Sequence, residues 1–227
     1  MDSDGSAFRR GGIAGIGFLA LLVFQAIVVG QPEKPNAAPD AIARSIAEHR
    51  NGGFAGSYAL ALATMLFVFF AVALCQKLDR AGAPSDIVTV ARLSAVLGVS
   101  MYFALSAVQI GNLYLVHHVG TETTKALNAI VFVGGNLVGV PLGVFLILIG
   151  WAALKTAAMP DWLGWTALLV GVGELVSAGA FAQQGAFAAT GPIVVIFALL
   201  LVFAWILAAS ILLLRASTIQ DPAERLA

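Results

Sequence analysis

A single acidic residue, Glu174, lies in the middle of the apolar stretch 168–176. Burial of a carboxyl group in apolar surroundings disfavours its charged form, so we expect Glu174 to be protonated at rest and to donate a hydrogen bond. A group held in this way can carry a proton or balance the charge of a cationic ligand. Alternatively, it makes an interhelical hydrogen bond that only fixes packing and contributes about 1 kcal/mol. The sequence leaves both interpretations open.

Polar residues on neighbouring apolar segments lie at a similar depth. At a rise of about 1.5 Å per residue, Asn136, Tyr102 and Ser106 fall, like Glu174, within about one turn of the middle of the bilayer. Gln109 continues the stripe of Tyr102 and Ser106 at helical spacing. Polar groups are not left facing lipid, so we expect a central polar cluster inside the bundle. The candidate ligand- or proton-binding residues are Glu174, Asn136, Tyr102, Ser106 and Gln109.

The segment that carries Asn136 is weakened by glycine and proline. Pro141 lacks a backbone N–H group, which leaves the carbonyl of Leu137 without its helical partner. Broken helices line binding sites in transporters, but kinks also occur in membrane helices without any ligand. Gly135, Gly139 and Gly143 form a ridge of small residues at which another helix can approach closely.

Other site chemistry is excluded or poorly supported. The single cysteine, Cys75, rules out an intramolecular disulfide and a cysteine-based metal cluster. His118 and Glu122 would give two metal ligands, fewer than a zinc site requires. His49 is the only histidine besides His117 and His118, so a pair of transmembrane haem ligands is lacking. There is no glycine-rich phosphate loop, nucleophile elbow or zinc-protease motif. We therefore predict no catalytic residue, no cofactor and no metal ion.

The composition indicates which kind of secondary structure positions these residues. The chain of 227 residues is 60% hydrophobic and 11% charged, with a formal net charge of zero. Soluble domains are nearer half apolar and a quarter charged, and a nucleic-acid-binding protein needs a basic surface. The sequence predicts an all-α polytopic membrane protein, a single domain over residues 1–227 that forms a six-transmembrane-helix bundle. The predicted spans are 11–30, 54–76, 93–116, 126–154, 162–181 and 192–214.

The first span also has features of a signal peptide, because Arg9 and Arg10 precede an apolar run. The run is long for such a peptide and further spans follow, so we favour a retained helix. Gln25 and Thr64 are polar groups near the middle of the first and second spans.

The longest polar stretch, 31–53, separates the first two spans. Within it, Ile42 and Ile46 share one face of a predicted amphipathic helix over 40–50, and 51–53 (Asn-Gly-Gly) is expected to end that helix. The helix either covers the outer mouth of the bundle or rests on the lipid headgroups, and we favour the second interpretation.

The basic residues predict the orientation. Six spans place both termini on one side, and that side holds eight basic residues against four on the other. The eight are Arg9, Arg10, Lys77, Arg80, Arg92, Lys155, Arg215 and Arg225, and the four are Lys34, Arg44, Arg50 and Lys125. The positive-inside rule therefore predicts that both termini are cytoplasmic and that the helix within 31–53 is extracytoplasmic.

Three stretches resemble a group of uncharacterised bacterial multi-pass membrane proteins catalogued as a domain of unknown function. They are 41–50 in the polar stretch, 73–78 at the end of the second span and 159–165 at the start of the fifth. The resemblance implies a location in the bacterial cytoplasmic (inner) membrane. It implies no established activity, and it identifies no functional residue.

These observations favour a non-enzymatic membrane protein that binds or transports a small or lipophilic solute through the cluster around Glu174. The second hypothesis is a structural or regulatory subunit, whose surface contacts another copy or another membrane protein. The third, an intramembrane enzyme, lacks a paired acid and base. All three hypotheses place the protein in the lipid bilayer, and none of them involves nucleic acid.

Overall fold

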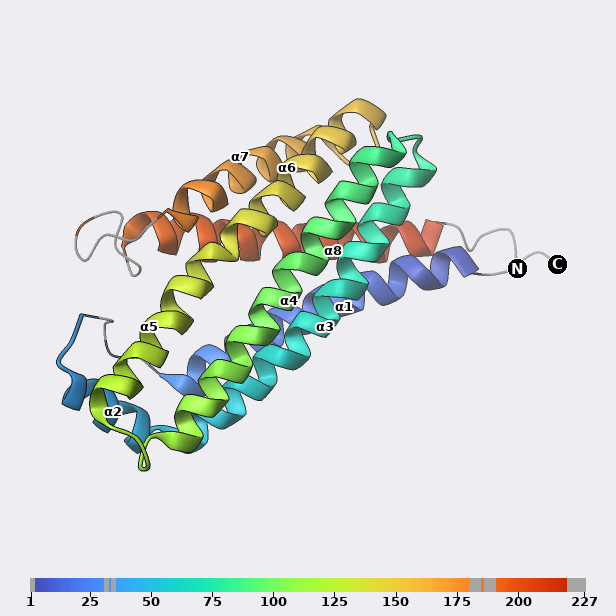
Figure 1. Cartoon of the computed structure of the whole chain (residues 1–227). Helices are drawn as coiled ribbons and strands as arrows, with labels where there is room; N and C mark the ends of the chain where they lie inside the picture. Colours follow the sequence, from blue (N-terminus) through green and yellow to red (C-terminus); the bar gives the residue numbers. More distant parts are fainter. Residues whose placement is uncertain (1–2, 31–32, 34–35, 180–184, 186–190, 220–227) are drawn as a thin grey trace.

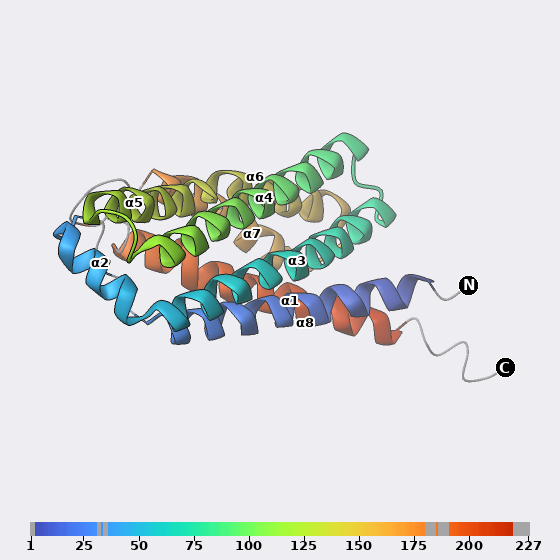
Figure 2. The same cartoon turned by 60° about the horizontal axis from the view of Figure 1, so that its bottom comes forward.

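The computed structural model describes residues 3–30, 33, 36–179, 185 and 191–219. All regular secondary structure in these residues is helical, and the helices form an elongated bundle (Figures 1 and 2). The helices are α1 (Ser3–Val29), α2 (Pro39–Glu48), α3 (Arg50–Arg80), α4 (Ser85–Leu115), α5 (Thr121–Leu137), α6 (Gly139–Thr156), α7 (Asp161–Ala178), the π-helix η1 (Val194–Leu201) and α8 (Val202–Ile219).

The predicted all-α membrane fold is confirmed at this level. In the described chain, 5 helical segments are long and apolar enough to cross a membrane. They are Gly5–Val29, Arg50–Arg80, Ser85–Leu115, Thr121–Thr156 and Val194–Ala216. The predicted span 162–181 corresponds to α7, which is not among them, and residues 180 and 181 lie outside the described part. Asp161 and Glu174 lower the mean hydropathy of this helix.

Local sequence signals account for several helix starts. Pro84 and Pro160 directly precede α4 and α7, where a missing N–H group costs nothing. Asp86 and Asp161 lie in the first turns of these helices, where a negative charge interacts favourably with the helix dipole.

Aromatic side chains from four helices form the centre of the core. Phe67 packs with ring-centroid distances of 5.2 Å to Phe18, 5.9 Å to Phe70 and 5.7 Å to Phe145. Trp205 meets Phe70 edge to face at 6.4 Å. This cluster connects α1, α3, α6 and α8.

The glycine ridge of the fourth predicted span is covered within the chain. A Cβ atom on Gly143 would lie 2.7 Å from the carbonyl oxygen of Gly171, and one on Gly139 would lie 2.8 Å from that of Glu174. A Cβ atom on Gly135 would meet no other atom within 4 Å. The ridge therefore holds α6 against α7, and only Gly135 remains available to an outside partner.

The regular helical hydrogen bonding of the fourth predicted span changes where proline and glycine weaken it. α5 ends at Leu137 and α6 begins at Gly139, but Val138 between them keeps helical backbone angles, so the two helices continue one another within the segment Thr121–Thr156. The ring of Pro141 packs near Gly98 of α4, since a Cβ atom there would lie 3.6 Å from the proline Cγ.

The amphipathic helix is present, but its predicted end is wrong. α2 ends at Glu48, and 51–53 forms the first part of α3. Gly52 and Gly53 lie too close to Val28 and Leu113 to carry larger side chains, so tight packing explains the glycines there better than a helix stop. α2 packs against α5 and α3 with Ile42 buried, at the end of the bundle away from the chain termini (Figure 2).

The start of α1 and the end of α8 lie at one end of the bundle (Figure 1). Lys77 and Arg80 at the end of α3 lie over the ring of Phe8, at 5.6 and 4.7 Å from its centroid. Arg92 of α4 forms an ion pair with Asp79. Several of the basic residues assigned to the cytoplasmic side are therefore gathered at this end.

Candidate ligand-binding cavity

A central cavity lies where α1 and the η1–α8 segment diverge. The two run side by side near the chain termini, where a Cβ atom on Gly12 would lie 2.8 Å from the carbonyl oxygen of Ser210. They separate toward the other end of the bundle (Figures 1 and 2). A cavity of about 670 Å³ occupies this region and is bounded by residues of α1, α3, α4, α6, η1 and α8.

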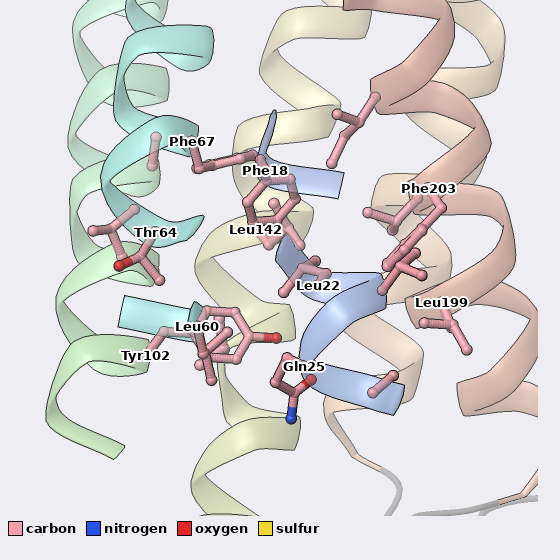
Figure 3. A pocket seen from close by; sticks show the side chains of 18 of the residues that line it. Phe18, Leu22, Gln25, Leu60, Thr64, Phe67, Tyr102, Leu142, Leu199 and Phe203 are labelled. Carbon is pink, nitrogen blue, oxygen red and sulfur yellow. The ribbon is translucent and has the colours of Figure 1, made fainter. Parts of the chain in front are cut away.

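The wall of the cavity is almost entirely apolar. Phe18, Leu22, Leu60, Leu142 and Phe203 face it from four helices, α1, α3, α6 and α8 (Figure 3). Among the described residues that line it, none is Asp, Glu, Lys, Arg or His. The cavity therefore suits an uncharged molecule, since a buried charge without a partner is costly.

The polar side chains that line the cavity are those of Gln25, Thr64, Ser94 and Tyr102. The hydroxyl of Thr64 donates to the carbonyl of Ala61 at 2.7 Å and is thus satisfied. The side chains of Gln25 and Tyr102 have no hydrogen bond to the rest of the described chain, and they lie near each other at one end (Figure 3). Both residues are half-buried, and their side chains can donate hydrogen bonds to a ligand and accept them from it.

Glu174 lies outside the cavity. Its side chain is 3% exposed, and Oε1 has no hydrogen-bond partner in the described residues. The carboxyl packs at Gly139, where a Cβ atom would lie 3.0 Å from Oε2. Val138 and Leu142 face the cavity from the same stretch of chain, so this stretch separates the cavity from Glu174.

The other predicted site residues are distributed along α4 and α5. Ser106 is buried, and its hydroxyl donates to the carbonyl of Tyr102 at 2.9 Å. Asn136 is half-buried in the last turn of α5. Gln109 lines a second, smaller cavity. Of the five predicted residues, Tyr102 alone lines the large cavity.

The second cavity has a volume of about 40 Å³ and lies beneath α2. Glu33, Ser45, His49, Gln109 and Asn128 supply its polar groups. Such a volume holds no more than a few water molecules. The Oε1 atom of Gln109 is buried there without a hydrogen-bond partner among the described residues, which fits a hydrated space better than a solute site.

Sequence reasoning missed the apolar wall. Leu22, Leu60 and Leu142 belong to runs of similar residues, so nothing in their type separates a cavity position from a core position. The useful signal was Gln25, a polar residue in the middle of an apolar span, because such a residue requires either a partner or a ligand.

Neither the curated proteins nor the solved structures that were searched contain a match to this chain. One family model matches residues 13–216, which include the helices that form the cavity and also Glu174. This agrees with the expected family of unknown function, and the chain belongs to the family described as Domain of unknown function (DUF4386).

Proposed function

We propose that this integral membrane protein binds a small lipophilic molecule in the central cavity. The observation that carries the proposal is the cavity itself, with a volume of about 670 Å³ and an apolar wall. Ligand sites in proteins have volumes of about 300–1,000 Å³ and combine apolar walls with a few polar groups that orient the ligand. Gln25 and Tyr102 have that second role.

The proposal includes the topology of the protein in the membrane. We infer that it crosses the cytoplasmic membrane of a bacterium six times, with α7 as the fifth span and both termini in the cytoplasm. The gathering of Lys77, Arg80 and Arg92 at the end where α1 begins supports this orientation.

Glu174 gives the site a means of responding to protons. Its carboxyl packs at Gly139, directly beside Val138 of the cavity wall. A ligand that presses on this wall therefore changes the environment of Glu174, and a change in the protonation of Glu174 acts on the same wall. This coupling supports movement of the bound molecule linked to a proton, with Ser106 supporting the backbone at Tyr102.

The second hypothesis, a subunit that uses its glycine ridge to bind a partner, has less support. Gly139 and Gly143 are buried against α7, so these two residues of the ridge are not accessible to another protein.

A cavity-filling substitution tests the proposed binding. In lipid nanodiscs, a small aryl diazirine without a head group should label peptides of the cavity wall, and excess unlabelled analogue should suppress that labelling. Leu60→Trp places a larger side chain in the cavity and should abolish the suppressible labelling. Leu62→Trp is the matched control, since Leu62 lies on the same helix but is 42% exposed and does not line the cavity.

The control should behave like the wild type. The proposal is overturned if wild-type protein shows no suppressible labelling at the cavity wall, or if Leu60→Trp retains it with the fold intact.

A further inference from the structure

The cavity reaches the outer surface of the bundle between α1 and η1. Val23 and Ile27 of α1 are 49% and 73% exposed, and both line the cavity. Leu199 and Leu200 of η1 also line it and are 45% and 58% exposed. These four residues, here called the lips, thus belong both to the cavity wall and to the exterior.

The lips lie on segments that are candidate membrane spans, Gly5–Val29 and Val194–Ala216. The exterior of such segments faces hydrocarbon, and exposed apolar residues are the expected surface there. An opening bordered by apolar residues on two spans leads into the bilayer rather than into water.

The two larger polar side chains that line the cavity lie at one end of it, whereas the small hydroxyl of Ser94 lies about 12 Å from Tyr102 along α4, at a rise of about 1.5 Å per residue. Figure 3 shows Gln25 and Tyr102 at one end and Phe18 and Phe67 toward the other. Phe18 and Gln25 are seven residues apart on one helix, which corresponds to about 10 Å at a rise of about 1.5 Å per residue. A molecule that fills this space has a hydrogen-bonding group at one end and an apolar chain.

We propose that the ligand is a single-chain amphiphile with an uncharged hydrogen-bonding head, such as a monoacylglycerol or a long-chain alcohol, and that it enters from the bilayer through the lips. Its head bonds to Gln25 and Tyr102, and its chain lies against Phe18 and Phe67. This inference rests on the proposed binding function of the cavity. An ionised head is disfavoured because no described lining residue carries a charge that would compensate for its desolvation.

The head preference is tested with a monoacylglycerol that carries a diazirine in its chain. In nanodiscs, unlabelled monoacylglycerol should compete for the labelled site at least tenfold better than lysophosphatidylcholine or an ionised fatty acid. Gln25→Leu and Tyr102→Phe should each weaken binding about threefold to tenfold, the usual effect of losing one hydrogen bond. Both variants should bind the aryl diazirine, which has no head, as well as the wild type does.

The two probes distinguish the failures. The proposed function is overturned if the wild type shows no aryl diazirine labelling that excess unlabelled analogue suppresses. If the wild type keeps this signal, two results would overturn the head assignment alone. One is that both variants bind the monoacylglycerol as tightly as the wild type does, and the other is that the charged amphiphiles compete as well as the monoacylglycerol.

The route is tested by narrowing the lips. The double substitution Ile27→Trp/Leu200→Trp should slow the release of bound monoacylglycerol at least tenfold in a chase with excess unlabelled compound. The control Leu93→Trp lies on α4, where Leu93 is 63% exposed and does not line the cavity, and should release it at the wild-type rate. Equal release rates in all three proteins would overturn the lateral route.

Discussion

Replacement of Gly143 by alanine tests how α6 is held against α7. The new Cβ atom would lie 2.7 Å from the carbonyl oxygen of Gly171, closer than carbon and oxygen atoms approach without movement. Both partners are main chain, so no side chain can rotate away and the helices must separate. Overpacking of this kind costs about 1–3 kcal/mol, and for a chain of this size each kcal/mol lowers Tm by about 2–4 °C. We expect Gly143→Ala to lower Tm by about 2–12 °C.

The protein carries its own reporter for this measurement. Cys75 is its single cysteine and is fully buried, so a thiol-reactive fluorogenic dye reports unfolding in detergent micelles. Gly135→Ala is the matched control: a Cβ atom on Gly135 meets open space, and alanine favours the helix by up to about 1 kcal/mol. Gly135→Ala should therefore leave Tm unchanged or raise it. The packing of α6 on α7 would be refuted if Gly143→Ala left Tm unchanged while Gly135→Ala lowered it.

Three further substitutions test other parts of the structure. In proteoliposomes, Glu174→Gln should abolish proton uptake coupled to movement of the bound molecule while leaving binding intact, and a pH-sensitive dye inside the vesicles measures this; unchanged uptake would remove Glu174 from the mechanism. Trp205→Phe should lower the stability by about 1–3 kcal/mol in the thiol-dye assay, because it removes the 3.0 Å bond from the indole N–H to the buried carbonyl of Leu163; an unchanged Tm would contradict the importance of that bond. Arg50→Met removes a 3.0 Å bond to a carbonyl of α4 and should increase hydrogen exchange in α2 and the first turns of α3, whereas exchange equal to that of the wild type would show that this end is held by apolar packing alone.

The membrane class and most of the helix positions could be predicted from the sequence, because long apolar runs have few alternatives to a helix in lipid. The change in helical hydrogen bonding near Pro141 was also predictable, since proline removes a donor wherever it occurs. The end of the amphipathic helix was not: the glycines of 51–53 serve close packing on Val28 and Leu113, and a local signal cannot distinguish that role from a helix stop.

The candidate site was predictable only in part. Depth along a helix placed Tyr102 and Glu174 at a similar level, but depth does not show which helices are neighbours. The cavity depends on the divergence of α1 from η1, which is set by glycines near Ser210 and by the packing of Phe197 against Gly173. These are contacts between distant parts of the chain, and no periodic pattern encodes them.

Occupancy of the central cavity is tested most directly by a high-resolution structure of the protein in nanodiscs of bacterial lipid. We predict elongated density between α1, α3, α4 and α8, with one end within hydrogen-bonding distance of Gln25 and Tyr102. A closed cavity, with the lips in contact and the wall residues packed on one another, would contradict the proposed function.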